Sequence, residues 1–299
     1  MTLALIAGQG ALPRFLAEKL IAANDPPVIC VFHTFVPDAP VELPRLHFRL
    51  ETLGTFLATL VEAGVTRLCM AGAVRRYPIE ADLIDERTRP LVARLTDAMA
   101  KGDDGTLREI VAIIEETGIK VVGPKDLVPE LVLSAGIPTE QKPSPVHDQD
   151  VTAGYRELRV MGAADLGQAC VIRAGKVVAA EEKSGTKALI DRFKAEPDPR
   201  MSVDPVEWAM DAVADIFKSD PVYDALPGEG MVLFKGPKPT QDLRVDLPTI
   251  GPDTAQDAAE AGFDGIIIQA GSVIVLDAPL VIDILNNAGM FLWVHEAQT

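Results

Sequence analysis

The segment 235–248, KGPKPTQDLRVDLP, gathers charged side chains of both signs in one short stretch. It follows the apolar run 230–234, which is typical of a buried strand, and it precedes a turn at Gly251 and Pro252. Proline fixes its own φ and biases the residue before it toward extended backbone, so the prolines of this segment stiffen its path. The charged residues are Lys235, Lys238, Asp242, Arg244 and Asp246.

This pattern suits a phosphate site. Lysine and arginine can hold phosphoryl oxygens, and a carboxylate can hold Mg²⁺ or position a water. We predict Asp242 as the essential carboxylate and Asp246 as the second, with both as Mg²⁺ ligands. The cations Lys235, Lys238 and Arg244 would contact phosphate. The alternative interpretation is a solvated surface loop with local ion pairs, because most charge runs are solvated.

Two stretches near the N-terminus also suit anions. The apolar residues 3–7 are followed by Gly8-Gln9-Gly10 and a helical pattern, an order that presents backbone N–H groups to a ligand. The turn lacks the third glycine of a GxGxxG motif, so a tight structural turn is an equal alternative for Gly8 and Gly10. Arg75 and Arg76 follow a predicted strand at 66–71 and could clamp a phosphate, the alternative being a solvated pair.

Asp103 and Asp104 precede a predicted helix at 106–117. They suit the N-cap of that helix, because aspartate caps helices well. Because neither half alone offers carboxylates and enough cations, we expect a site between the halves. Arg75 or Arg76 and Lys238 would converge on one pyrophosphate as the halves close on substrate.

The segment 235–248, with LPTIGPDT at 247–254, resembles the signature of the LpxI-type UDP-2,3-diacylglucosamine pyrophosphatases of lipid A synthesis. The glycine turn before Leu12 and Pro13, the run GAVRR at 72–76 and the run KGDD at 101–104 are similar to that family as well. The resemblance implies that Asp103 and Asp104 face the substrate cleft, with a helix cap as the equal alternative. The resemblance covers nearly the whole chain from residue 8 onward, except 195–230. It favours the functional interpretation of the glycine turn.

The resemblance implies a Mg²⁺-dependent hydrolase that cleaves UDP-2,3-diacylglucosamine to UMP and 2,3-diacylglucosamine 1-phosphate (lipid X). It implies a cytoplasmic protein that meets its lipid-linked sugar nucleotide at the inner face of the inner membrane, as a peripheral protein. We also expect a homodimer and no nucleic-acid partner. Further expected substrate-binding residues are Gln168, Gly185, Thr186 and Gln241.

The chain departs from the family pattern beside Gly185 and Thr186. Ser184 and Lys187 stand where acidic residues are expected. If such a carboxylate normally helps to hold the metal, metal binding here is altered or falls to Glu181 and Glu182. The stretch 195–230 is longer than expected and carries a predicted helix at 204–217 with Trp208, which we interpret as a peripheral insertion.

Composition narrows the class of protein. The formal net charge of −16 argues against nonspecific nucleic-acid binding, which needs a basic face. It also requires a local concentration of cations, or a metal, around an anionic substrate. Cys30 and Cys69 lie in apolar runs and are expected core thiols, which favours a reducing cytoplasm. The sequence shows neither a signal peptide nor an uninterrupted apolar run long enough to span a membrane.

The order of strands and helices predicts an α/β protein. We expect an N-terminal Rossmann-like parallel sheet domain at 1–137, a proline-rich linker at 138–148, and a C-terminal α/β catalytic domain at 149–299. The second sheet should be mixed, because hairpins at 169–181 and 265–276 require antiparallel pairs. Two other functions remain open: a non-catalytic nucleotide-sugar or phospholipid-binding protein, and a nucleotide-dependent oxidoreductase, against which the incomplete glycine motif argues.

Overall fold

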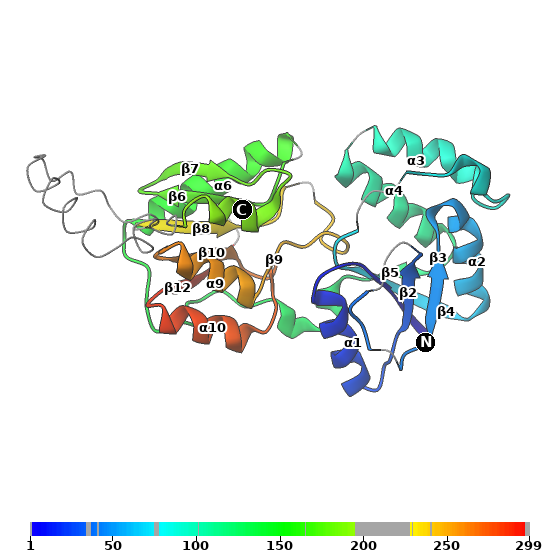
Figure 1. Cartoon of the computed structure of the whole chain (residues 1–299), viewed down its shortest axis with the longest axis horizontal. Helices are drawn as coiled ribbons and strands as arrows, with labels where there is room; N and C mark the ends of the chain where they lie inside the picture. Colours follow the sequence, from blue (N-terminus) through cyan, green and yellow to red (C-terminus); the bar gives the residue numbers. More distant parts are fainter. Residues whose placement is uncertain are drawn as a thin grey trace, which may run out of the picture.

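The computed structural model describes residues 2–33, 37–40, 42–74, 78–100, 102–164, 166–194, 228, 230–239 and 241–296. Figure 1 shows two units side by side, each built around a sheet, the first coloured blue to cyan and the second green to red. The first sheet is parallel and the second is mixed, so the predicted fold class is confirmed. The predicted helix at 204–217, with Trp208, lies outside the described residues.

The first sheet has five parallel strands. Their spatial order is β3 (Arg45–Phe48), β2 (Val28–Phe32), β1 (Thr2–Ala7), β4 (Val65–Ala71) and β5 (Lys120–Val121). The edge strand β3 was not predicted, because its sequence RLHF lacks the apolar run of the central strands. Every strand therefore ends at the same edge of the sheet, where the glycine turn follows β1 and the GAVRR run follows β4.

Helices cover both faces of this sheet, as the alternation of buried residues requires. Leu3 and Leu5 of β1 pack in one core with Leu16 of α1, while Ala4 packs in another with Phe56 of α2. The helices are α1 (Leu12–Ala22), α2 (Leu53–Glu62), α3 (Val92–Met99), α4 (Asp103–Glu116) and α5 (Pro124–Leu127), with 3-10 turns at Leu50–Thr52, Ala81–Leu83, Arg89–Leu91 and Pro129–Leu131.

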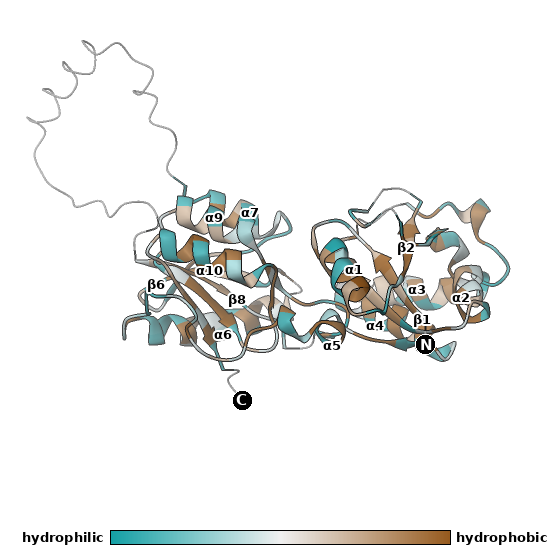
Figure 2. Cartoon of the chain, turned by 90° about the horizontal axis from the view of Figure 1, so that it is seen from below, coloured by the Kyte–Doolittle hydropathy of each residue, from teal (hydrophilic) through white to brown (hydrophobic). Residues whose placement is uncertain are grey.

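The second sheet carries the segment of interest on its central strand. Its order is β12 (Phe291–His295), β10 (Gly265–Gln269), β8 (Met231–Lys235), β6 (Ala169–Arg173) and β7 (Lys176–Ala180). The strands β12, β10 and β8 are parallel, whereas β6 runs antiparallel to both β8 and β7. Figure 2 shows hydrophobic strands between helices whose outer faces are hydrophilic. The helices are α6 (His147–Ala163), α7 (Gly185–Asp191), α9 (Pro252–Glu260) and α10 (Ala278–Asn287).

The expected hairpin at 265–276 does not form. β11 (Ile274–Val275) instead pairs in parallel with β9 (Thr249–Ile250) in a separate two-stranded sheet. The reason is burial: Ile274 is fully buried within the hydrophobic core of the first unit, with Leu247 and Leu276 packed against that core. Side chains within residues 247–276 of the second unit thus join the two units by packing in the core of the first.

The expected linker packs against the second sheet. The backbone of Gly136 pairs with that of Val294, and the buried hydroxyl of Thr139 accepts a hydrogen bond from the backbone N–H of Leu292 at 2.9 Å. The domain boundaries themselves remain a prediction.

Replacing Gly154 with alanine tests how closely α6 packs against β8. A Cβ on Gly154 would overlap the fully buried ring of Phe234, the residue before Lys235. Overpacking of this kind costs about 1–3 kcal/mol, against a gain of up to about 1 kcal/mol in helix propensity. We expect a net loss of stability, measured by urea unfolding.

The matched control is Val160→Ala in the same helix. Val160 is 57% exposed, so its change should stay within about 0.5 kcal/mol of the native chain. Equal stability of the two variants would contradict the close approach of α6 to β8.

Candidate functional site

The segment after β8 folds into a tight path held by its own backbone and side chains. The backbone N–H of Lys238 donates to Oε1 of Gln241 at 2.8 Å, and the N–H of Gln241 returns to the carbonyl of Lys238 at 3.2 Å. One turn later, the N–H of Asp246 donates to the carbonyl of Asp242 at 3.0 Å. Asp242 and Asp246 are therefore carried by one turn of backbone.

A cavity of about 260 Å³ opens beside this path. Both units contribute to it: Asp104 comes from α4 of the first unit, and the other lining residues come from the second. Those residues are Leu166, Gly167, Gln168, Glu181, Glu182, Lys183, Lys238 and Asp246. The structure thus brings together four of the predicted residues, namely Asp104, Gln168, Lys238 and Asp246, and it does so across the two units.

Lys238 is the buried cation among the cavity-lining residues, which also include Lys183. Its side chain is 6% exposed, and its Nζ lies 3.0 Å from Oδ1 of Asp104. The ion pair joins the loop after β8 to the N-terminal turn of α4. Lysine is a common binder of phosphoryl oxygens, so this ammonium group suits a phosphate ligand.

Asp246 lines the cavity from the second unit, whereas Asp104 lines it from the first. Burial raises the pKa of Asp246, while a hydrogen bond from Gln168 and the charge of Lys238 act to lower it. Nε2 of Gln168 donates to Oδ2 of Asp246 at 3.2 Å. A carboxyl group whose pKa is raised toward neutrality is better suited to accept a proton than an ordinary aspartate.

Asp242 has the opposite environment. Oδ2 accepts a hydrogen bond from Nη2 of Arg244 at 2.7 Å, and Oδ1 accepts from the backbone N–H of Arg244 at 3.0 Å. The Arg244 hydrogen bond lowers the pKa of Asp242. Arg244 also reaches Glu115 of α4, with Nη1 to Oε1 at 3.0 Å. Asp242 therefore stays ionised, close to the first unit.

Lys235, at the end of β8, is buried and is linked through Thr186 to Glu181, which lines the cavity. Its Nζ donates to Oγ1 of Thr186 at 2.7 Å, and that hydroxyl donates to Oε1 of Glu181 at 2.6 Å. Burial lowers the pKa of Lys235, and the charges of Glu181 and Asp246 act to raise it. The predicted residues Lys235 and Thr186 are thus joined by a hydrogen bond, next to Glu181. The sequence suggested Glu181 only as a metal ligand in place of the acids that are missing beside Gly185 and Thr186.

The glycine turn of the first unit has a packing explanation. The backbone N–H of Gly8 donates to the carbonyl of Ala71 at 2.7 Å, and a Cβ on Gly8 would overlap the backbone of Gly72. Gly10 has a φ of +94° and open space around it. Neither lines the cavity that holds Lys238. Arg75 and Arg76, and the side chain of Asp103, lie outside the described residues.

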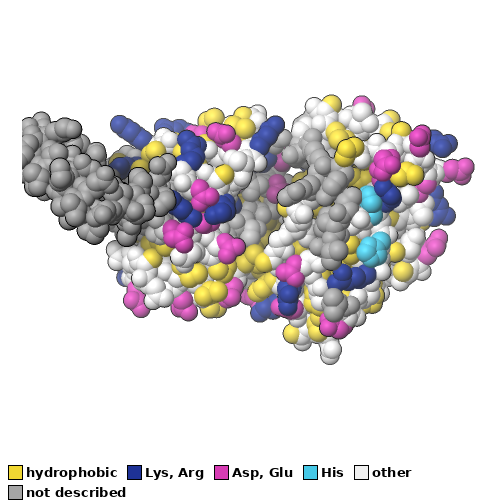
Figure 3. Space-filling model, in the orientation of Figure 1, with side chains coloured by type: hydrophobic (Ala, Val, Ile, Leu, Met, Phe, Trp, Pro, Cys, Tyr) yellow, Lys and Arg dark blue, Asp and Glu magenta, His cyan; other side chains and the backbone are white. Residues whose placement is uncertain are grey.

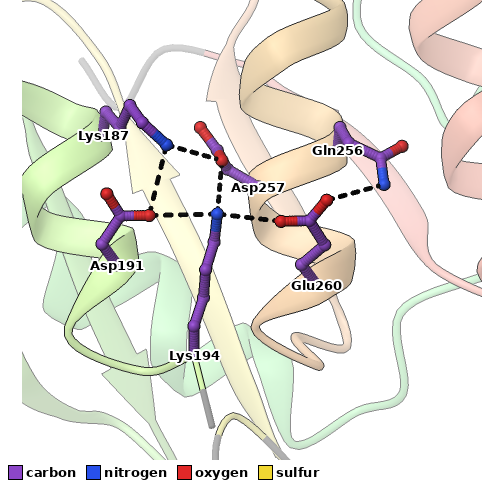
Figure 4. A network of polar contacts seen from close by, with 6 residues as sticks. All are labelled: Lys187, Asp191, Lys194, Gln256, Asp257 and Glu260. Carbon is purple, nitrogen blue, oxygen red and sulfur yellow. Dashed lines mark hydrogen bonds and ion pairs between the residues drawn. The ribbon is translucent and has the colours of Figure 1, made fainter. Parts of the chain in front are cut away.

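Lys187, which stands where an acid was expected, belongs to an ion-pair network between α7 and α9. Its Nζ lies 3.0 Å from Oδ1 of Asp257, and Lys194 contacts the same oxygen and lies 3.0 Å from Glu260 (Figure 4). Hydrogen bonds to Asp257 and Asp191 raise the pKa of Lys187. Its side chain is thus engaged on a helix surface and not at the cavity.

Charges outside the cavity are mixed. Figure 3 shows Lys and Arg side chains interspersed with Asp and Glu over the second unit. In the described part of the chain, no group of three or more His, Cys, Asp or Glu side chains is close enough to hold a metal alone. None of the helices in these described residues is long and apolar enough to cross a membrane.

Comparison with known proteins matches both units. A family model described as the LpxI N-terminal domain matches residues 2–131, and one described as the LpxI C-terminal domain matches residues 134–293. A protein of Caulobacter vibrioides (strain ATCC 19089 / CIP 103742 / CB 15), described as UDP-2,3-diacylglucosamine pyrophosphatase LpxI, is 32% identical over 294 residues. The match covers 97% of this chain and 96% of that protein.

Proposed function

The chain belongs to the LpxI family, and on that premise we propose that it hydrolyses the pyrophosphate bond of UDP-2,3-diacylglucosamine to UMP and 2,3-diacylglucosamine 1-phosphate. The observation that carries the proposal is the cavity, where Lys238 and Asp246 of one unit meet Asp104 of the other. A site for a pyrophosphate needs both cations and a carboxylate, and this cavity holds both. The binding-only and oxidoreductase alternatives are not favoured.

The two carboxylates of the turn suit different tasks. Environments that push the pKa values of two acids apart commonly separate their roles. Asp246, with its raised pKa, is placed to accept a proton from the attacking water. As the water oxygen bonds to phosphorus, the bridging oxygen leaves with the electron pair, and Lys235 and Lys238 offset the negative charge that develops.

Mg²⁺ fits the chemistry of this donor set. Magnesium is usually bound by one or two carboxylates together with substrate phosphates, so a cluster of three protein ligands is not required. Asp242, which stays ionised, and Asp104 would hold the ion. Asp246, predicted above as a second ligand, would act as the proton acceptor instead. When bound, the ion would neutralise charge on the phosphoryl oxygens.

Chelation tests the metal. We expect EDTA to abolish UMP release and added Mg²⁺ to restore it, because a chain of net charge −16 meets an anionic substrate. Release of UMP from the lipid-linked substrate is measured by chromatography. Undiminished activity in thoroughly chelated buffer would mean that the lysines and arginines suffice.

The substrate also bears on where the protein acts. Its acyl chains reside in a membrane, so we propose that the protein associates transiently with the inner face of the inner membrane. Leu166, which lines the cavity and is 41% exposed, offers an apolar contact for an acyl chain in this proposal. The homodimer remains a prediction.

A further inference from the structure

Glu181 is a buried carboxylate at a meeting point of three segments. It follows β7 and is 8% exposed. Its Oε2 accepts a hydrogen bond from the backbone N–H of Gln168 at 2.5 Å, and its Oε1 accepts from the hydroxyl of Thr186 at 2.6 Å. The carboxylate therefore fixes both the entry to β6 and the first turn of α7.

The surrounding backbone leaves space for this carboxylate. A Cβ on Gly167 would overlap the Glu181 side chain, so only glycine allows the carboxylate to lie where it does. Both oxygens of Glu181 are engaged by donors of the chain itself.

Thr186 extends the contact from Glu181 to Lys235. Its hydroxyl proton goes to Glu181, and its oxygen accepts from Nζ of Lys235 at 2.7 Å. Within the described residues, Lys235 makes this hydrogen bond and no ion pair. An ammonium group has three donors, so two remain to bind oxygens of a ligand.

The charge of Glu181 also bears on the state of this lysine. The ammonium is almost fully buried, and burial lowers its pKa, which the negative charge of Glu181 counteracts. A buried cation is retained in its charged form only when compensating charge lies close by.

We propose that Glu181 is a positioning residue for the phosphate-binding Lys235, which it orients through the hydroxyl of Thr186. Glu181 lines the cavity, but both of its oxygens accept hydrogen bonds from the chain itself, so its role in this proposal is to orient Lys235. The inference rests on the proposed function, because it assigns Lys235 a ligand of the same reaction.

The first test is Glu181→Gln. Glutamine carries no charge and presents an NH₂ group in place of one carboxylate oxygen, so it cannot keep both contacts, which use separate oxygens of Glu181. We expect kcat/KM for UMP release to fall about 10- to 100-fold, the usual effect of removing a group that orients a ligand-binding side chain. Thr186→Val should reproduce the loss, whereas Thr186→Ser, which keeps the hydroxyl, should retain most of the activity.

A double-mutant cycle separates positioning from mere stabilisation. Lys235→Met removes the group through which Glu181 acts, so adding Glu181→Gln to Lys235→Met should lower kcat/KM by much less than it does in the native chain. Additive losses, or full activity of Thr186→Val, would overturn the inference.

Asp150→Asn is the matched control. Asp150 is also a buried carboxylate with two donors, the backbone N–H of Gly175 and His147, but it lies at the other end of the β6–β8 pair. Its loss should destabilise the chain and combine additively with Lys235→Met. If the native chain released no UMP, the proposed function would be wrong. If the native chain were active but the losses of Glu181→Gln and Lys235→Met were additive, only the positioning role of Glu181 would be wrong.

Discussion

Replacing Asp242 with alanine is expected to reduce kcat by about 100-fold or more while the chain stays folded. The Arg244 hydrogen bond keeps Asp242 ionised, and that charge is what a Mg²⁺ ligand requires. Binding of Mg²⁺, measured by calorimetry, should weaken in the same variant. Retention of more than about a tenth of native activity, a change of only about 1.4 kcal/mol in the barrier, would remove Asp242 from the reaction.

Glu115→Gln is the control for this variant. It removes the other ion-pair partner of Arg244 without touching Asp242. Both side chains are about 40% exposed, so the pair should contribute no more than about 1 kcal/mol to stability. We expect near-native turnover, and a large loss here would mean that Arg244 and its contacts, not the Asp242 charge, matter most.

Replacing Asp246 with asparagine is expected to lower kcat by about 10²- to 10⁴-fold, the range for loss of a general base. Asparagine keeps an oxygen that can accept from Gln168, so the geometry of the cavity should persist. Stability near neutral pH should hold or rise. The raised pKa means that the folded chain binds this proton more tightly than the unfolded chain does, so ionising Asp246 costs stability as the pH increases.

The pH dependence offers a second measure of Asp246. If turnover needs its ionised form, activity is present above its pKa and is lost as the pH falls through it. Because the Gln168 hydrogen bond lowers that pKa, Gln168→Ala should move the acid limb of kcat to higher pH. An acid limb that stays in place in Gln168→Ala would contradict the assignment of Asp246 as the proton acceptor.

The sequence predicted the sheets better than their pairings. Apolar runs such as 230–234 identify buried strands, because a central strand is covered on both faces. The partner of a short strand such as Ile274–Val275 is set by burial in the other unit, which local pattern does not reveal. Hence the first hairpin was predicted correctly and the second was not.

Residue types likewise identified the cations and carboxylates, but not their grouping. Lys238 and Asp104 are far apart in sequence, and their contact depends on how the two units pack. Glu181 was missed as an orienting group because its partners are a backbone N–H and a hydroxyl, neither of which forms a motif. The sequence feature most closely tied to Glu181 is Gly167. Glycine is required there because any Cβ would overlap the Glu181 side chain, and this contact is visible only in the folded structure.

The position of Ile274 couples the unfolding of the two units. This side chain belongs to the second unit in sequence but completes the core around Leu3, Leu5 and Leu16 of the first. Removing a buried isoleucine commonly costs about 2–5 kcal/mol, a large part of the roughly 5–15 kcal/mol that holds a typical domain folded. A cut between the units would therefore leave one core incomplete and expose an apolar surface on the other fragment. We therefore expect the two units to melt together, so that a ligand bound in the cavity raises the resistance of the entire molecule to heat and proteases.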